Sequence, residues 1–170
     1  PNGVWSYGSM DVAFTTFTPF IHQRTDIFGF DLWSPPGVPP HVGLNASATP
    51  TFNVPPGYLA LHPGPGPEPA VLRWTAPAGF SGSIDVNGQF LSGDIGSMQL
   101  AVRRGSTVLW SGTDSGAFAL SSLVVAPGDT IDFAVFGGYS YGNTPLQLTI
   151  TASSASGEQT LYVSNSGNNT

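Results

Sequence analysis

Proline and glycine recur every few residues along this chain, and this punctuation limits what it can fold into. The 170 residues include 16 prolines and 22 glycines. Proline removes a backbone donor and glycine weakens a helix interior, so both residues interrupt helices. No window of ten or more residues combines helical apolar spacing with the absence of both. We therefore expect short strands separated by turns at intervals of roughly 8–12 residues, as in a sandwich or barrel.

The stretch from Ala70 to Phe90 carries the clearest strand pattern. Side chains alternate with period two over residues 70–76 and again over residues 80–90. Pro77 and Gly79 separate the two runs, and Asn87-Gly88 is a turn signal at the end of the second. We interpret this stretch as a hairpin at the centre of the fold.

About eleven or twelve strands are expected in all, so the predicted fold is all-β: a single antiparallel, jelly-roll-like sandwich over residues 1–152. Residues 153–170 are expected to be a linker and the start of a following domain. The expected strands outside the central stretch are residues 5–10, 14–20, 27–33, 41–45, 58–62, 97–103, 106–112, 118–125, 130–136 and 146–152.

The charge content excludes several classes of partner. Only 8% of residues are charged, lysine and cysteine are absent, and the formal net charge is −6. No basic patch can form to attract nucleic acid or an anionic membrane, and no apolar run is long enough to insert into a bilayer. Without cysteine there are no disulfides or thiolate metal sites. A surface covered by small polar residues suits a secreted, extracellular bacterial module.

Several short sequence motifs of this chain occur in the same order in a known class of protein domain. They include Asn2 to Gly8, Pro40 to Asn45, Leu61 to Gly64, Val71 to Pro77 and Pro127 to Phe133, with Trp33 between the first two. Together they resemble a β-sandwich domain of bacterial secreted proteins, including those with a PEP-CTERM anchoring tail. The resemblance runs over most of residues 2–152 and implies an accessory module.

The end of the chain has a resemblance of its own. Residues 160–169, TLYVSNSGNN, are similar to the opening of secreted right-handed parallel β-helix domains, many of which are polysaccharide lyases or glycoside hydrolases. The similarity implies that a β-helix domain follows in the full-length chain. Because the sequence begins at Pro1 without a signal peptide, we expect it to be a processed or trimmed piece.

Metal-dependent or hydrolytic chemistry has little support in the motifs. His22, His41 and His62 lie in separate segments, and His62, before Pro63, is expected to be a hydrogen-bonded strand-end residue. Most aspartates lie at turns. In the phrase PGDTIDF, Asp129 and Asp132 are interpreted as structural, with a structural calcium as the alternative.

Carbohydrate binding needs exposed aromatic rings beside fixed polar groups. The candidates are Trp33 before a proline-rich loop, Trp110 at a strand end, and Tyr139 and Tyr141 in the segment GGYSYGN. Arg73 either pairs with a buried aspartate or points into a binding surface. Trp5 and Trp74, in contrast, are expected in the core.

Three functions follow, in order of preference. The first is a non-catalytic carbohydrate-binding module that holds a polysaccharide-active enzyme on its polysaccharide or oligosaccharide. The second is a structural or protein-interaction spacer, favoured if Trp110, Tyr139 and Tyr141 are all buried. The third is an enzyme or part of one, which requires a cleft that gathers at least two of Asp11, Asp31, Asp85, Asp94, His62 and Arg73.

Overall fold

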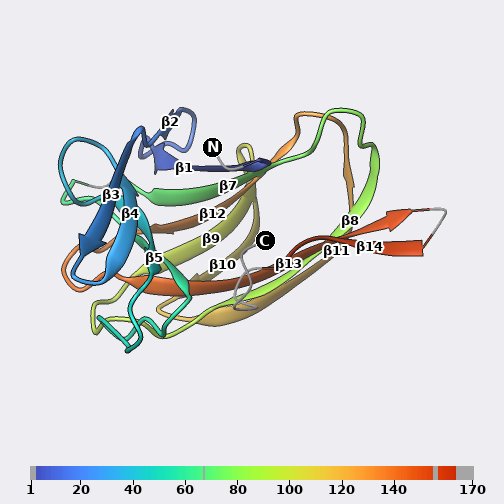
Figure 1. The fold of residues 1–170 in the computed structure, drawn as a ribbon. Coiled ribbons are helices and arrows are strands. Elements are labelled where there is room, and N and C mark those ends of the chain that lie inside the picture. Colours follow the sequence, from blue (N-terminus) through green and yellow to red (C-terminus); the bar gives the residue numbers. More distant parts are fainter. Residues whose placement is uncertain (1–2, 67, 155–156, 164–170) are drawn as a thin grey trace.

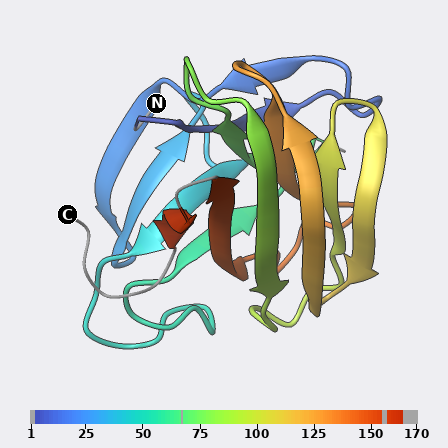
Figure 2. The same ribbon diagram turned by 90° about the vertical axis from the view of Figure 1, so that its right-hand side faces the viewer.

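A computed structural model of the chain describes residues 3–66, 68–154 and 157–163. These residues form two antiparallel sheets that face each other as a sandwich, and they contain no helix (Figures 1 and 2). The predicted fold class is therefore confirmed. No helix in this part of the chain is long and apolar enough to cross a membrane.

The two sheets divide the strands between them. The first has six strands, in the order β10 (Thr107–Thr113), β9 (Gln99–Arg104), β12 (Thr130–Phe136), β7 (Ala70–Thr75), β1 (Trp5–Met10) and β2 (Phe17–Pro19). The second has the order β11 (Gly116–Val125), β8 (Gly82–Phe90), β13 (Thr144–Ser154), β6 (Leu59–His62), β5 (His41–Asn45), β4 (Phe30–Ser34) and β3 (His22–Ile27), with β14 (Gly157–Val163) paired to β13 outside this order.

The core lies between the sheets and is built from the inward residues of each alternating strand. Trp5 and Trp74 are both buried in it, which confirms their prediction as core residues. Both faces of β7 are buried. Leu72 and Trp74 point into the core, whereas Val71 lies in a small outer cluster beneath the segment that contains Phe17.

The predicted central hairpin is wrong. β7 pairs with β1 and β12 in the first sheet, whereas β8 pairs with β11 and β13 in the second. The connection between them therefore crosses from one sheet to the other. The Asn87-Gly88 signal is also not a turn, because β8 continues to Phe90. A Cβ at Gly88 would meet the Phe118 ring at 2.5 Å, so close packing explains this glycine.

The predicted strand over residues 27–33 is also wrong. The structure breaks it at Phe28 and Gly29, and Ile27 pairs with Phe30 across a two-residue turn between β3 and β4. The period-two alternation of side chains runs on through Phe28 and Gly29, so this pattern alone does not reveal the turn. The expected strand over residues 14–20 shortens to β2, whereas the predicted hairpin of β9 and β10 is confirmed.

The expectation that residues 153–170 are a linker and the start of a following domain remains a prediction. β13 runs to Ser154, beyond the expected strand end, and β14 pairs back onto it. Residues 155–156 of the expected linker and residues 164–170 of the β-helix-like tail lie outside the described part of the chain.

Candidate functional site

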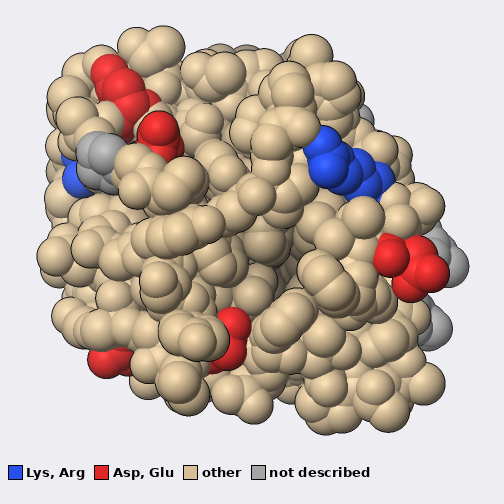
Figure 3. Space-filling model, turned by 90° about the vertical axis from the view of Figure 1, so that its left-hand side faces the viewer, with Lys and Arg blue, Asp and Glu red and all other residues tan. Residues whose placement is uncertain are grey.

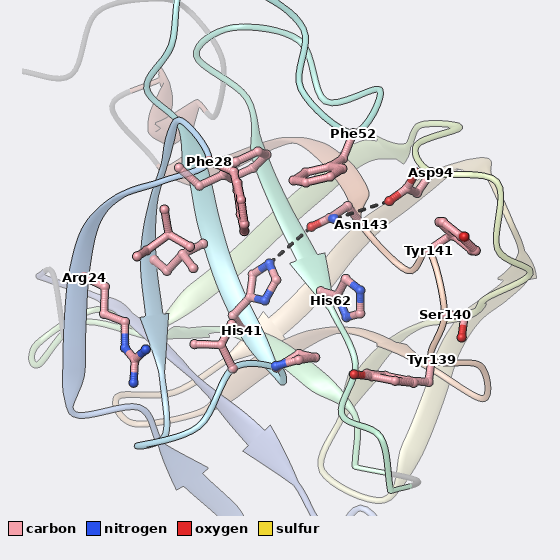
Figure 4. Close-up of a pocket in the computed structure, with 15 residues that line it drawn as sticks. Arg24, Phe28, His41, Phe52, His62, Asp94, Tyr139, Ser140, Tyr141 and Asn143 are labelled. Carbon is pink, nitrogen blue, oxygen red and sulfur yellow. Dashed lines mark hydrogen bonds between the residues drawn. The ribbon is translucent and has the colours of Figure 1, made fainter.

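A cleft of about 640 Å³ opens on the outer face of the second sheet, at the end formed by β3 to β6. Val42 and Leu61 point inward to the core, so their neighbours His41 and His62 point outward into the cleft. The turn at Phe52 and the loops that carry Asp94 and residues 139–143 complete the wall (Figure 4). The end of the molecule shown in Figure 3 is hollowed and mostly uncharged.

A polar chain forms part of the cleft floor. The Asn143 side-chain oxygen lies 3.1 Å from Nε2 of His41, and its amide nitrogen donates to Asp94 Oδ2 at 3.5 Å (Figure 4). Because the amide nitrogen faces the carboxylate, the oxygen is the acceptor for His41. The hydrogen-bond network thus assigns the proton of the neutral His41 ring to Nε2. Both His41 and Asn143 are buried.

Both ring nitrogens of His62 form hydrogen bonds with backbone groups. Nδ1 lies 2.8 Å from the carbonyl oxygen of Pro63, and Nε2 accepts the N–H of Gly142 at 3.3 Å. This pattern requires a neutral ring protonated at Nδ1. His62 is therefore the hydrogen-bonded strand-end histidine that the sequence predicted, and it also anchors the loop that carries Tyr139 and Tyr141.

Burial keeps both rings uncharged. Desolvation, reinforced by neighbouring His62, lowers the pKa of His41 to about 3. Burial likewise lowers the pKa of His62, against opposing effects of the Pro63 carbonyl and Asp94. At neutral pH the floor therefore offers neutral imidazoles, an amide and one carboxylate.

Four exposed aromatic side chains surround this floor. The exposed fractions are 76% for Phe28, 45% for Phe52, 41% for Tyr139 and 62% for Tyr141. Phe28 and Phe52 meet edge to face with ring centroids 6.0 Å apart, and Tyr139 meets His62 edge to face at 5.8 Å. Rings that are exposed yet braced in this way can present flat apolar faces to a ligand.

The two candidate tryptophans do not line the cleft. Trp33 is half-buried on β4 and stacks on Tyr7, with centroids 4.4 Å apart. Trp110 is half-buried on β10 and stacks on Phe90 of the opposite sheet at 5.8 Å. A Cβ at Gly112 would lie 2.6 Å from the Trp110 ring, which shows how closely the chain packs there. Each tryptophan ring therefore packs against an aromatic residue of the opposite sheet.

Arg73 pairs with a buried aspartate, which is the first of the two alternatives that the sequence left open. Its Nε and NH2 donate to the two carboxylate oxygens of the fully buried Asp132 at 2.6 and 2.8 Å, and its guanidinium lies 4.1 Å from the Phe17 ring centroid. Asp132 faces Arg73 in the register of β7 and β12. This pair stabilises the first sheet, away from the cleft.

The other candidate metal ligand is also occupied. Asp129 Oδ2 accepts the Ala126 N–H at 2.9 Å and pairs with Arg104 at 2.6 Å. The Ala126 hydrogen bond, followed by that from Arg104, holds the pKa of Asp129 below its usual value. In the described ranges, no group of three or more His, Asp or Glu side chains could hold a metal ion.

The structure thus brings together Tyr139 and Tyr141 and adds residues that sequence reasoning missed as ligand contacts. Phe28, Phe52 and Asn143 are the main additions. Two dipeptides could have predicted the turns that carry the phenylalanines: Phe28-Gly29 and Phe52-Asn53. Each contains a residue, glycine or asparagine, that tolerates the left-handed backbone conformation of a tight turn. The cleft also gathers Asp94 and His62, two of the six residues named for the enzyme alternative.

No protein-family model and no curated protein matches this chain. No family is identified, and an all-β sandwich of two antiparallel sheets is what the structure shows.

Proposed function

We propose that this chain is a non-catalytic carbohydrate-binding module and that the cleft is its glycan site. The observation that carries the proposal is the placement of four exposed aromatic rings around a floor with Asp94 and Asn143. In the wider proposal, the module belongs to a secreted polysaccharide-active protein and precedes a β-helix domain.

The chemistry of a sugar ring suits this arrangement. Its C–H face packs on an aromatic ring, while its hydroxyls need both donors and acceptors at fixed positions. The Asp94 carboxylate accepts hydrogen bonds, and the Tyr139 and Tyr141 hydroxyls can donate or accept them. A cleft of about 640 Å³ falls within the usual size range of ligand sites.

Catalysis has less support at this cleft. Asp94 is the one carboxylate in its described lining, whereas glycosidases ordinarily use two. His62 contacts a backbone acceptor and a backbone donor through its two ring nitrogens, so neither is free to transfer a proton in this arrangement. The same two residues therefore fit binding and loop positioning better than acid–base chemistry.

Affinity gel electrophoresis tests the proposal. The 170-residue chain is run through gels that contain hydroxyethylcellulose, xylan, mixed-linkage β-glucan, pectin or alginate, with and without EDTA. We expect retardation by at least one polysaccharide and its loss in Tyr141→Ala. Val124→Ala, which alters an exposed apolar residue outside the cleft lining, is the charge-matched control.

Retardation that survives Tyr141→Ala would remove the cleft from the proposal. If none of the polysaccharides retards the wild-type chain, the structural spacer becomes the better explanation.

A further inference from the structure

Two tight turns hold a phenylalanine at a positive φ angle, a backbone conformation that phenylalanine rarely adopts. At the turn between β3 and β4, Phe28 and Gly29 have φ angles of 54° and 85°. At a second two-residue turn, where Thr51 and Val54 exchange backbone hydrogen bonds, Phe52 and Asn53 have φ angles of 50° and 57°. Positive φ at both central residues is the pattern of a type I′ turn, which prefers Asn-Gly.

This conformation is unfavourable for a bulky side chain. A non-glycine residue in the left-handed region is uncommon, and Asn, Asp and Gly adopt it most easily. Tyr141 also has a positive φ, of 60°. Three of the four exposed aromatic residues around the cleft are therefore held against their own backbone preference. Such outliers concentrate at ligand clamps, where the surrounding fold maintains them.

Packing explains little of the choice of Phe28. Its side chain is 76% exposed, and its ring meets Phe52 edge to face. Phe52 in turn leans on the buried Phe30, with centroids 6.2 Å apart. In Figure 4 the Phe28 and Phe52 rings lie together at one side of the cleft.

The charges of the cleft indicate what kind of glycan it accepts. Arg24 and Asp94 are the charged side chains in its described lining, and they lie at opposite ends (Figure 4). Arg24 already donates to the Pro36 carbonyl, and neither of the two ion pairs found among the described residues includes Asp94, which accepts only the Asn143 amide through its Oδ2. With a chain charge of −6 and a single arginine in the described lining, the cleft favours an uncharged glycan over a polyanion.

We propose that Phe28, braced edge to face by Phe52, is the stacking platform for one sugar ring of an uncharged glycan, with Asp94 accepting hydrogen bonds from its hydroxyls. This inference rests on the proposed function and specifies its ligand and its contact residues. The turn at Phe28 keeps phenylalanine because the ring binds ligand, although asparagine would suit the backbone better.

The experiment measures stability and binding in the same variant. Phe28→Asn makes the turn Asn-Gly, the preferred type I′ dipeptide, and it removes an exposed ring. We expect its melting temperature to rise by about 2–4 °C, because relief of the turn outweighs the loss of one exposed edge-to-face contact with Phe52. We expect its affinity for hydroxyethylcellulose, xylan or β-glucan, whichever retards the wild type, to fall about tenfold.

Two further variants separate ring loss from other effects. Phe28→Trp keeps an aromatic face and should retain affinity within about threefold. Ile21→Asn introduces the same residue at an exposed apolar position outside the described cleft lining and should change neither affinity nor charge.

The outcomes distinguish this inference from the proposed function. If Tyr141→Ala loses binding but Phe28→Asn keeps it, the platform is overturned while the glycan site stands. Retardation by pectin or alginate alone overturns the uncharged ligand. A lower melting temperature of Phe28→Asn overturns the proposal that asparagine would suit this turn better. A wild-type chain that binds none of the polysaccharides overturns both.

Discussion

The imidazole rings of His41 and His62 stack on each other, with centroids 5.1 Å apart and 26° between the ring planes. The register of β5 and β6 sets the two residues directly opposite each other. Each neutral ring then holds a part of the cleft: His41 contacts Asn143, and His62 accepts the N–H of Gly142. Two uncharged histidines thereby connect the sheet to the loop that carries the tyrosines.

Stability should therefore fall as the pH falls through the histidine range. Both folded-state pKa values are below the ordinary value of 6.5, that of His41 at about 3, so the unfolded chain takes up protons first. The stabilisation is present above pH 6.5 and is lost progressively below it, by at most about 1.4 kcal/mol per pH unit for each histidine. Urea denaturation at pH 7.5, 6 and 5 measures this slope.

The same series in His41→Gln is the control, because glutamine does not titrate. The slope should become shallower by the His41 contribution. An equal slope in both proteins would show that His41 does not carry the dependence.

The Arg73–Asp132 pair should matter much more for folding than the Arg104–Asp129 pair. Asp132 is fully buried, so Arg73→Met leaves a buried carboxylate without its partner and should cost about 3–5 kcal/mol. Both members of the second pair are more than a third exposed, and Arg104→Met should cost less than about 1 kcal/mol. Chemical denaturation of the two variants provides the comparison, and equal losses would contradict it.

Gly96 should be intolerant of any side chain. A Cβ there would lie 2.6 Å from the carbonyl oxygen of Tyr141 and closer still to that of Ser140. Because these contacts are with backbone, Gly96→Ala should displace the loop that carries Tyr139 and Tyr141. We expect a loss of about 2 kcal/mol in the free energy of unfolding, together with weaker glycan binding.

Gly37→Ala is the matched control for Gly96, since a Cβ at Gly37 meets nothing within 4 Å. It should leave both stability and binding unchanged. Thermal melts of the two variants, run beside the binding gels, decide the prediction, which fails if Gly96→Ala behaves like Gly37→Ala.

Asp94→Asn tests the polar side of the cleft. The substitution keeps the shape of the side chain but removes an anionic acceptor, so affinity for an uncharged glycan should fall about tenfold. Asp26→Asn removes the same charge at an exposed position outside the described lining. Calorimetric titration of both variants should show the loss in Asp94→Asn only; a comparable loss in Asp26→Asn would point to net charge instead.

Local alternation predicted most of the strands but not their partners. The bounds of β1 and β5 agree with the prediction, and β9 and β10 form the expected hairpin around Gly105, which has a φ of 55°. Alternation predicts β7 and β8 as strands, but the single hairpin predicted from them is wrong, because they belong to different sheets. Period two reports which faces of a strand are buried, and it is the same whether the next strand pairs beside it or crosses to the other sheet.

The sequence by itself determined the all-β class, the buried positions of Trp5 and Trp74, and a nearly uncharged exterior. Those follow from proline and glycine punctuation, alternation and composition, which are local properties. Only the tertiary structure decided that Trp110 closes the sandwich and that Phe28, Phe52, Asp94 and Tyr141 surround one cleft. These four residues come from separate turns and loops, so their proximity depends on long-range strand pairing and on backbone angles that composition does not reveal.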